Sequence, residues 1–307
     1  MLARKHVNII FGGLSAILFG ISGILASVLF QRINMVPEWL VGMRMFWSGL
    51  LLILVLACKF GGSIFSIWYR KADAILIILF GVIGVLLAQS SFFLSVYFGD
   101  AAMATILQSL GPTIIIILLS IFYRKLPVRM DTISIIIALI GVFLLVTNGD
   151  IGHLKVTTQA LFWGIISAFG VAAYTLIPRP LLQQHHALLV VAWGLLIGGI
   201  AENLIQPLWH IPNNLQVIDW SMIGFIIIGG TLVPYALYVL SLCHLAPTTA
   251  SLLGIIEPLT ATLISVTLLG VQLLPVQIIG VCLILSTIIL ISLPVERIVE
   301  KFLKRRA

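Results

Sequence analysis

"GVLLAQSSFFLSVYFGDAAMATILQSLGP" (residues 84–112) and "GTLVPYALYVLSLCHLAPTTASLLGIIEP" (residues 230–258) align when the chain is shifted against itself by 146 residues. Seven of the 29 aligned positions are identical. Leucine matches are common between apolar segments, so the glycine, serine and proline matches carry most of the weight. At a shift of 150 residues, "FG" at 19–20 also meets "FG" at 169–170. The alignment predicts two copies of one structural unit, and the three informative pairs are Gly84/Gly230, Ser95/Ser241 and Pro112/Pro258.

Composition indicates which solvent this chain folds in. Of its 307 residues 61% are hydrophobic and only 9% are charged, whereas a soluble domain averages about 25% charged residues. The sequence therefore predicts an integral membrane protein. The net charge of +7 does not indicate a nucleic-acid partner, because the basic residues fall in short blocks between apolar stretches. The first apolar stretch is long enough to span a bilayer, so we expect a retained helix rather than a cleaved signal peptide.

Ten apolar segments are long enough to cross a membrane, which takes about 20 residues of helix. Short connections rich in glycine, proline and asparagine separate them. No connection has room for a nucleotide-hydrolysing domain, and the chain contains no phosphate-binding loop motif. Its isolated cysteines, Cys58, Cys243 and Cys282, have no metal-ligand spacing, so we expect neither a metal nor a cofactor. The segments are 7–29, 39–59, 74–97, 101–122, 131–148, 159–178, 187–206, 220–242, 247–269 and 275–294.

Lysine and arginine in the connections predict the orientation, because cytoplasmic connections carry an excess of both. With the N-terminus in the cytoplasm, only Arg32 and Lys155 fall outside and Arg44 lies within a segment. We therefore expect both termini in the cytoplasm, and a basic tail, 297–307, against anionic lipid. Fourteen basic residues fall inside: Arg4, Lys5, Lys59, Arg70, Lys71, Arg124, Lys125, Arg129, Arg179, Arg297, Lys301, Lys304, Arg305 and Arg306.

An odd number of segments per copy has a topological consequence. Residues 1–150 and 151–296 each hold five segments, so the second copy must enter the bilayer from the opposite side. The basic connection "YRKLPVR" (123–129) has the uncharged counterpart "LGVQLLP" (269–275), which agrees with this inversion. The predicted fold is an all-α membrane protein of ten transmembrane helices in two inverted-topology five-helix repeats. Such repeats are typical of carriers that alternate between two accessible states around a midplane site.

Glu257 is the acidic residue that this topology places deepest. It lies ten residues after Pro247, or about 15 Å into a core about 30 Å thick. A charge there costs about 2.5–3.5 kcal/mol, so it should face protein or water rather than lipid. Pro258 should kink the helix. Two interpretations remain open: Glu257 binds a substrate amine or carries a coupled proton, or it only accepts hydrogen bonds that fix helix packing.

Other polar and aromatic residues could line a cavity beside Glu257. Gln108 occupies the equivalent face of the fourth segment, and Arg44 could bind a carboxylate or extend to the outer surface. We expect His185 and His186 to be solvated, and Glu202 and Asn203 to be interfacial. Packing or lipid contact is the competing interpretation for each aromatic residue. The remaining candidates are Phe19, Gln89, Phe92, Trp163, Ser167, Tyr174, Tyr235 and Tyr238.

These features together resemble the EamA family of the drug/metabolite transporter superfamily. The resemblance rests on "FGISGILA" (19–26), "VGMRMFWSGLLL" (41–52) and "EPL" (257–259) within ten segments, and it covers about 7–294. It implies an inner-membrane carrier, often an exporter of amino acids or related metabolites, with the fourth and ninth helices near the axis. The first half has "GP" (111–112) where the second has "EP", so the two halves are chemically unequal.

The functional prediction is a secondary-active carrier that exports a small organic metabolite, an amino acid or a related compound, by alternating access. Proton coupling through Glu257 is a hypothesis based on its depth. Uptake of a sugar or nucleotide-linked sugar is the alternative within transport. A membrane enzyme or scaffold is the alternative outside it, although the ionisable residues are scattered rather than clustered at one depth. The expected partners are the metabolite, possible coupling protons (H+) and the lipid bilayer.

Overall fold

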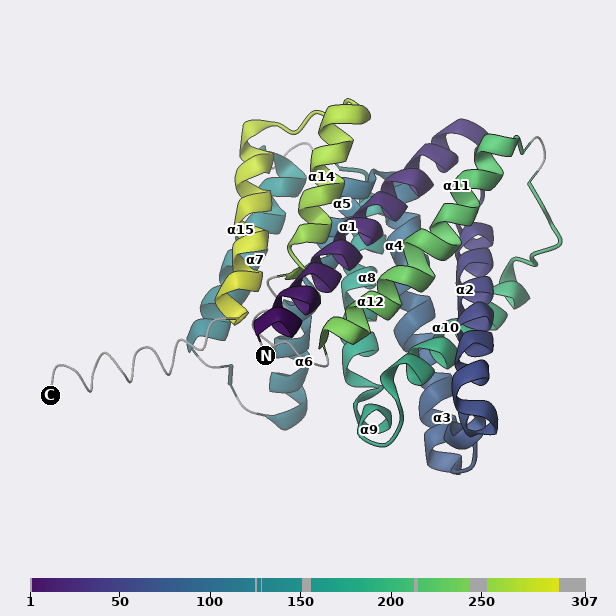
Figure 1. Ribbon diagram of the computed structural model, residues 1–307. Helices are drawn as coiled ribbons and strands as arrows, with labels where there is room; N and C mark the ends of the chain where they lie inside the picture. The colour runs from purple at the N-terminus through teal and green to yellow at the C-terminus, as the bar shows by residue number, and fades with distance from the viewer. Residues whose placement is uncertain are drawn as a thin grey trace, which may run out of the picture.

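The computed structural model describes residues 2–124, 126–127, 129–150, 156–212, 215–242 and 253–292. Within these residues the chain forms helices and turns and no strand (Figure 1). Long helices of the expected segments run through the molecule, and short ones lie in the connections. In chain order the elements are α1 (Leu2–Ile33), α2 (Pro37–Phe60), η1 (Gly61–Trp68), α3 (Lys71–Leu79), η2 (Phe80–Leu86), α4 (Leu87–Phe98), α5 (Ala101–Gln108), α6 (Gly111–Tyr123), α7 (Arg129–Thr147), α8 (Thr158–Leu176), α9 (Arg179–Leu182), α10 (Ala187–Ile205), α11 (Val217–Ile227), η3 (Ile228–Leu232), α12 (Val233–Leu242), α14 (Ile256–Leu268) and α15 (Pro275–Ser292).

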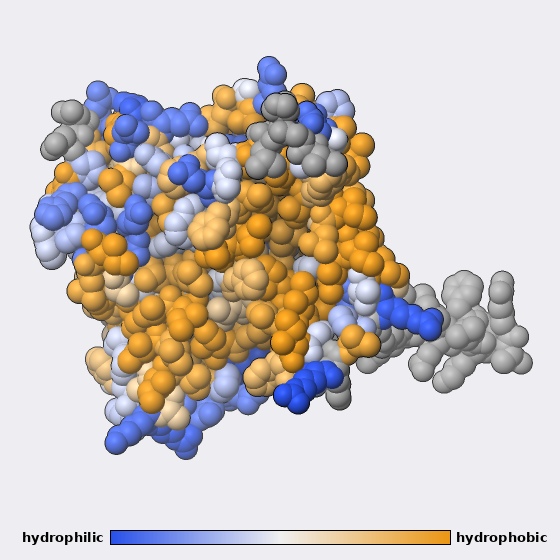
Figure 2. Space-filling model, turned by 180° about the vertical axis from the view of Figure 1, so that it is seen from behind, coloured by the Kyte–Doolittle hydropathy of each residue, from blue (hydrophilic) through white to orange (hydrophobic). Residues whose placement is uncertain are grey.

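Eight of the ten expected segments are helices long and apolar enough to cross a membrane. The helices of the ninth and tenth segments are shorter within the described residues, Ile256–Leu268 and Pro275–Ile291. The start of the ninth segment, Cys243 and the basic tail 297–307 lie outside the described residues. Figure 2 shows a broad hydrophobic band across the middle of the molecule, with hydrophilic residues gathered at both ends. The described chain is therefore a helical multi-pass membrane protein.

Helices from the two halves of the chain pack on one another. α2 packs along α10, α7 along α15, and α4 along α8, while α1 packs against both α12 and α14. Small residues allow the closest contacts, as expected where lipid supplies no hydrophobic driving force between helices. Gly49 of α2 lies against the backbone of Leu196, and Gly199 of α10 lies against the backbone of Phe46. The two halves thus form one interwoven bundle.

The third and eighth segments contain π-helical turns, which the apolar pattern did not predict. In η3, side chains bond to the carbonyls at the widened turn. Ser48 Oγ donates to the Ile227 carbonyl at 2.7 Å, and Thr231 Oγ1 donates to the Ile226 carbonyl at 2.8 Å. In η2, the Gly81 carbonyl instead lies so close to Gly198 of α10 that a side chain there would meet it at 2.8 Å. Each π segment is therefore held by the helix packed beside it.

The fourth segment and the described part of the ninth each contain a turn shortly before a proline. α5 ends at Gln108, and α6 begins at Gly111 with Pro112 in its first turn. A turn at Gly254–Ile255 precedes α14, and Pro258 again lies in the first turn of the new helix. Proline is well tolerated there, because the first N–H groups of a helix have no partner within it. The kink expected at Pro258 stays a prediction, because residues 243–252 on the other side of this turn lie outside the described part of the chain.

Candidate functional site

Tyr235 is the centre of a polar and aromatic group that four segments contribute. Its hydroxyl accepts a hydrogen bond from Gln89 Nε2 at 2.7 Å. Its ring meets Phe19 of α1 edge-on, with 5.0 Å between centroids, and lies 6.2 Å from Tyr174 of α8. Tyr235 itself is buried in α12. Residues far apart in the sequence, all of them candidates from the sequence, therefore converge around one phenol.

Glu257 lies at the edge of this group, in the first turn of α14. Its side chain is neither fully buried nor exposed, and its charge interacts with Tyr238, Tyr235 and Arg44. The N-terminus of a helix favours a negative charge by about 0.3–1 kcal/mol. The turn before α14 thus provides a local reason why a carboxylate is tolerated at this depth. The close packing of Gly20 of α1 against the Glu257 carbonyl fixes the start of α14 in place.

Arg44 points into the protein and does not extend to the surface. Its side chain is 2% exposed, Nε donates to Thr231 Oγ1 at 2.9 Å, and Nη2 donates to the Gly230 carbonyl at 3.4 Å. The guanidinium carbon also lies 4.6 Å from the centroid of the Phe93 ring, a cation–π contact. Of the two interpretations left open for Arg44, extension to the outer surface was wrong, because η3 and Phe93 provide partners for it inside. Arg44 braces the π segment that leads to Tyr235.

The remaining candidates from the sequence lie in packing positions. Phe92 is buried against Phe93, with 5.2 Å between ring centroids, and Trp163 packs on its neighbour Phe162 at 5.1 Å. Ser167 is fully buried and donates to the Gly164 carbonyl of its own helix at 2.7 Å. Gln108 is partly buried at the end of α5. The structure brings together seven of the eleven candidates: Phe19, Arg44, Gln89, Tyr174, Tyr235, Tyr238 and Glu257.

The sequence did not identify several residues that support this site. Thr231 and Ser48 hold η3 through their hydrogen bonds, and Phe80 packs on Tyr174 with 5.3 Å between ring centroids. The "GGT" at 229–231 was the available signal, because paired glycines inside an apolar helix mark an irregular turn. Glu202 lies inside the protein near the end of α10, where it is 2% exposed and packs near Gly42 of α2.

No cluster of metal-ligating side chains occurs among the described residues. An apolar groove on the surface of α2 and α11, lined by Met43, Trp47, Trp220 and neighbouring aliphatic residues, contains none of the residues around Tyr235. The functional groups around Tyr235 are one carboxylate, one guanidinium, one amide, and phenol and phenyl rings.

Comparisons with known proteins agree with a role in transport. The model of the EamA-like transporter family matches residues 7–147 and 158–293. "Uncharacterized inner membrane transporter YicL" of Salmonella typhimurium is 35% identical over 287 residues, covering 92% of this chain and 94% of that protein. "Uncharacterized transporter YyaM" of Bacillus subtilis is 21% identical over 64% of this chain and 66% of its own length. A crystal structure at 17% identity and a TM-score of 0.60 covers 92% of this chain and 99% of its own, which shows a shared fold. The chain belongs to the EamA-like transporter family.

Proposed function

We propose that this protein is a secondary-active carrier of the inner membrane that moves a small organic metabolite, an amino acid or a related amine, by alternating access. Export is the proposed direction, with both termini in the cytoplasm, as the distribution of lysine and arginine favours. The observation that carries the proposal is the convergence of Glu257, Tyr235 and Gln89 beside the turn in the ninth segment. Interrupted helices in corresponding places of two repeats are typical of carrier binding sites.

The packing supports two repeats of inverted topology. Exchanging the halves turns the contact of α4 with α8 into that of α12 with α1, and the contact of α8 with α6 into that of α1 with α14. The contacts of α2 with α10 and of α7 with α15 map onto themselves. A shift of 146 residues also carries the end of η2, Val82–Leu86, onto η3. A twofold relation between the halves accounts for all of these correspondences.

The same contacts suggest which parts move. α8 packs with α4, α5 and α6 of the first half, whereas α1 packs with α11, α12 and α14 of the second. Each half therefore contributes one helix to the other's bundle. Gln89 belongs to the first bundle and Tyr235 to the second, so their hydrogen bond crosses between the bundles. We infer that rocking of the two bundles exposes Glu257 to one side of the membrane and then to the other.

The available charge favours a substrate that carries an amine. The Nε and Nη2 donors of Arg44 are taken by Thr231 and Gly230, whereas Glu257 is partly accessible among aromatic rings. Aromatic rings beside a carboxylate favour an ammonium group over a neutral sugar. A phosphorylated substrate would need a free cationic group, and the one arginine buried around Tyr235 is already bonded. An amino acid or related amine therefore fits better than the sugar and nucleotide-sugar alternative.

Counterflow in proteoliposomes tests this function. Vesicles loaded with one metabolite of a panel of amino acids, amines and sugars should take up the same labelled compound. A charge-assisted hydrogen bond contributes about 1.5–3 kcal/mol, so Glu257→Gln should weaken amine-dependent counterflow about 10- to 100-fold. Glu38→Gln is the matched control, because Glu38 lies in the first turn of α2, and it should retain full activity.

A pH gradient across the same vesicles tests proton coupling. If Glu257 carries the coupled proton, an imposed gradient accelerates flux in the unmodified protein and has no effect in Glu257→Gln. Full gradient-driven flux in Glu257→Gln would contradict proton coupling through this residue. Absence of counterflow for every member of the panel would contradict the carrier function itself.

A further inference from the structure

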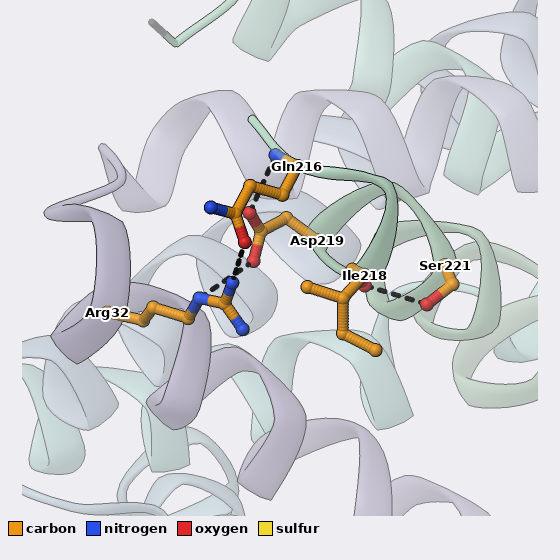
Figure 3. A network of polar contacts seen from close by, with 5 residues as sticks. All are labelled: Arg32, Gln216, Ile218, Asp219 and Ser221. Carbon is orange, nitrogen blue, oxygen red and sulfur yellow. Dashed lines mark hydrogen bonds and ion pairs between the residues drawn. The ribbon is translucent and has the colours of Figure 1, made fainter. Parts of the chain in front are cut away.

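Two ion pairs at opposite ends of the molecule link segments of different halves. The first joins the end of α1 to the start of α11 (Figure 3). Arg32 Nε lies 3.4 Å from Asp219 Oδ1, and a second Arg32 nitrogen donates to Gln216 Oε1. Asp219 Oδ2 also accepts from the Gln216 backbone N–H at 2.9 Å, which caps α11. The Asp219 side chain is fully buried, while that of Arg32 is 38% exposed.

The second pair joins the connection before α10 to the start of α3. His185 Nε2 lies 3.2 Å from Asp73 Oδ2, and His185 Nδ1 lies 3.5 Å from Ser66 Oγ of η1. The His185 and Asp73 side chains are 10% and 6% exposed. Beside them, Arg70 Nη1 donates to Gln184 Oε1 at 2.8 Å. The expectation that His185 is solvated was wrong, because the carboxylate of Asp73 and the hydroxyl of Ser66 hold its ring between helices.

The two pairs occupy equivalent places in the two halves. Asp73 and Asp219 are separated by 146 residues (219 − 73 = 146), which is the shift that aligns the repeats, and each lies in the first turn of its helix. Arg32 lies just after the first segment, close to the connection that leads into α2. His185 lies after the sixth segment, close to the connection that leads into α10. An arginine–glutamine hydrogen bond accompanies both pairs. The basic partners differ, since one is arginine and the other is histidine.

This difference gives one pair a guanidinium and the other an imidazole. Arginine stays charged at every physiological pH, whereas histidine as a residue type changes its charge between about pH 5 and pH 8. A neutral His185 can donate from Nε2 to Asp73 and accept at Nδ1 from Ser66. A protonated His185 donates from both nitrogens, and its bond to Asp73 becomes charge-assisted. Protonation therefore strengthens the second pair and leaves the first pair unchanged.

The surroundings of His185 leave Asp73 as its acidic partner. The other charged or titratable side chains between Cys58 at the end of α2 and Lys71 at the start of α3, and those of α9 and its connection to α10, are exposed. Two of them have other contacts, since the Lys59 ammonium lies 5.3 Å from the Phe60 ring and the His186 ring lies 5.3 Å from the same ring. None of these neighbours carries a carboxylate, and five of them are basic: Lys59, Arg70, Lys71, Arg179 and His186.

We propose that His185 and Asp73 form a pH-sensitive latch at the cytoplasmic end of the carrier, and that Arg32 and Asp219 form its permanently charged counterpart at the outer end. The gating role rests on the proposed function. A protonated latch fixes the start of α10 to α3, so acidification of the cytoplasm slows opening toward that side. The permanent pair makes the outer end insensitive to pH.

Hydrogen–deuterium exchange of the full chain in lipid nanodiscs tests the latch without requiring transport. The amides of His185, Leu189 and Val190 donate within 181–190 and report on the latch, and those of Asp219 and Trp220 report on its counterpart. After correction for intrinsic rates, a change from pH 8 to pH 6 should slow exchange at the first set about fivefold. The second set should not change. Equal behaviour of both sets, or no change in either, would overturn the latch.

Reciprocal substitutions sharpen the test. His185→Arg should give slow exchange at both pH values, and His185→Gln should give fast exchange at both. His186→Gln, the control, should keep the pH dependence of the unmodified protein. Arg32→His should transfer the pH dependence to Asp219 and Trp220. Persistent pH dependence of the first set in His185→Gln would show that another group titrates, and would overturn the assignment to His185.

Counterflow at internal pH 6 and pH 8 then tests the gating role. Flux should be several-fold slower at internal pH 6, and His185→Gln should abolish this difference. If hydrogen–deuterium exchange depends on pH but flux does not, the gating role is overturned and the proposed function remains intact. Normal exchange behaviour without counterflow of any metabolite would contradict the proposed function and still support the latch.

Discussion

The contact between α2 and α10 allows a quantitative test of the fold. A methyl group added at Gly49 would lie 2.5 Å from the backbone nitrogen and 2.8 Å from the Cα of Leu196. Ordinary van der Waals contacts begin at 3.4 Å. In Gly49→Ala the two helices must therefore separate by about 1 Å, because the obstructing atoms belong to the backbone and cannot rotate away.

Overpacking of this kind costs about 1–3 kcal/mol. We expect Gly49→Ala to lie at the upper end of that range, since the displaced element is a whole helix. Gly224→Ala in α11 is the matched control, because nothing lies within 4 Å of a methyl group there. The control should be neutral or more stable by up to about 1 kcal/mol, since glycine inside a helix carries an entropic cost.

Thermal unfolding of the purified full chain in detergent, followed by tryptophan fluorescence, measures the difference. Gly49→Ala should unfold several degrees below the unmodified protein and below Gly224→Ala. Gly199→Ala should behave like Gly49→Ala, because its methyl group would lie 2.7 Å from the Cα of Phe46. If Gly49→Ala and Gly224→Ala unfold at the same temperature, α2 and α10 do not pack backbone to backbone and the described arrangement is refuted.

Three further predictions concern polar residues. Burial raises the pKa of Asp100, which caps α5, so the folded state binds a proton more tightly than the unfolded state. The free energy of unfolding should therefore fall as pH rises just above about 4. Asp100→Asn should abolish this slope, and Asp100→Ala should cost about 1 kcal/mol in denaturant titrations; an unchanged slope in Asp100→Asn would contradict the assignment. Arg44→Lys should destabilise the protein by about 1–3 kcal/mol, since lysine cannot reproduce the bond from Nε to Thr231; unchanged chemical denaturation would show that Arg44 does not brace η3. Gln89→Leu removes the donor to Tyr235 and should lower counterflow several-fold without changing the thermal unfolding temperature; equal losses of both would indicate a packing role.

The helical membrane fold could be predicted because apolar length is a strong signal in this chain. The irregular parts could not. In the third and eighth segments, a π turn and an α turn would place similar apolar residues in similar surroundings, so the apolar pattern does not distinguish the two kinds of turn. The one sequence signal for a π turn is "GGT" at 229–231. The turn before Pro258 could not be predicted for a similar reason, since a proline fits both a kinked helix and the first turn of a new one.

Residues around Tyr235 were predictable in part because polar and aromatic side chains are scarce in the apolar segments. Their direction was not, because lipid is as apolar as the protein interior and leaves no amphipathic pattern to follow. Ser167 was expected to line the cavity, yet it bonds to its own helix, a common solution for serine in apolar surroundings. Arg44 was ambiguous because its inward partners, Thr231 and Phe93, come from segments far away in the sequence.

The inverted arrangement of the two halves is the central claim, and thiol labelling from each side of the membrane tests it most directly. Leu126 and Gln272 are exposed and are separated by the repeat shift of 146 residues (272 − 126 = 146). The test replaces Cys58, Cys243 and Cys282 by serine and introduces a single cysteine at one of these two positions. Each variant is then treated with a membrane-impermeant thiol reagent, once in intact cells and once in inside-out vesicles. The account predicts that Gln272→Cys reacts only in intact cells and Leu126→Cys only in inside-out vesicles. Reaction of both from the same side would contradict it.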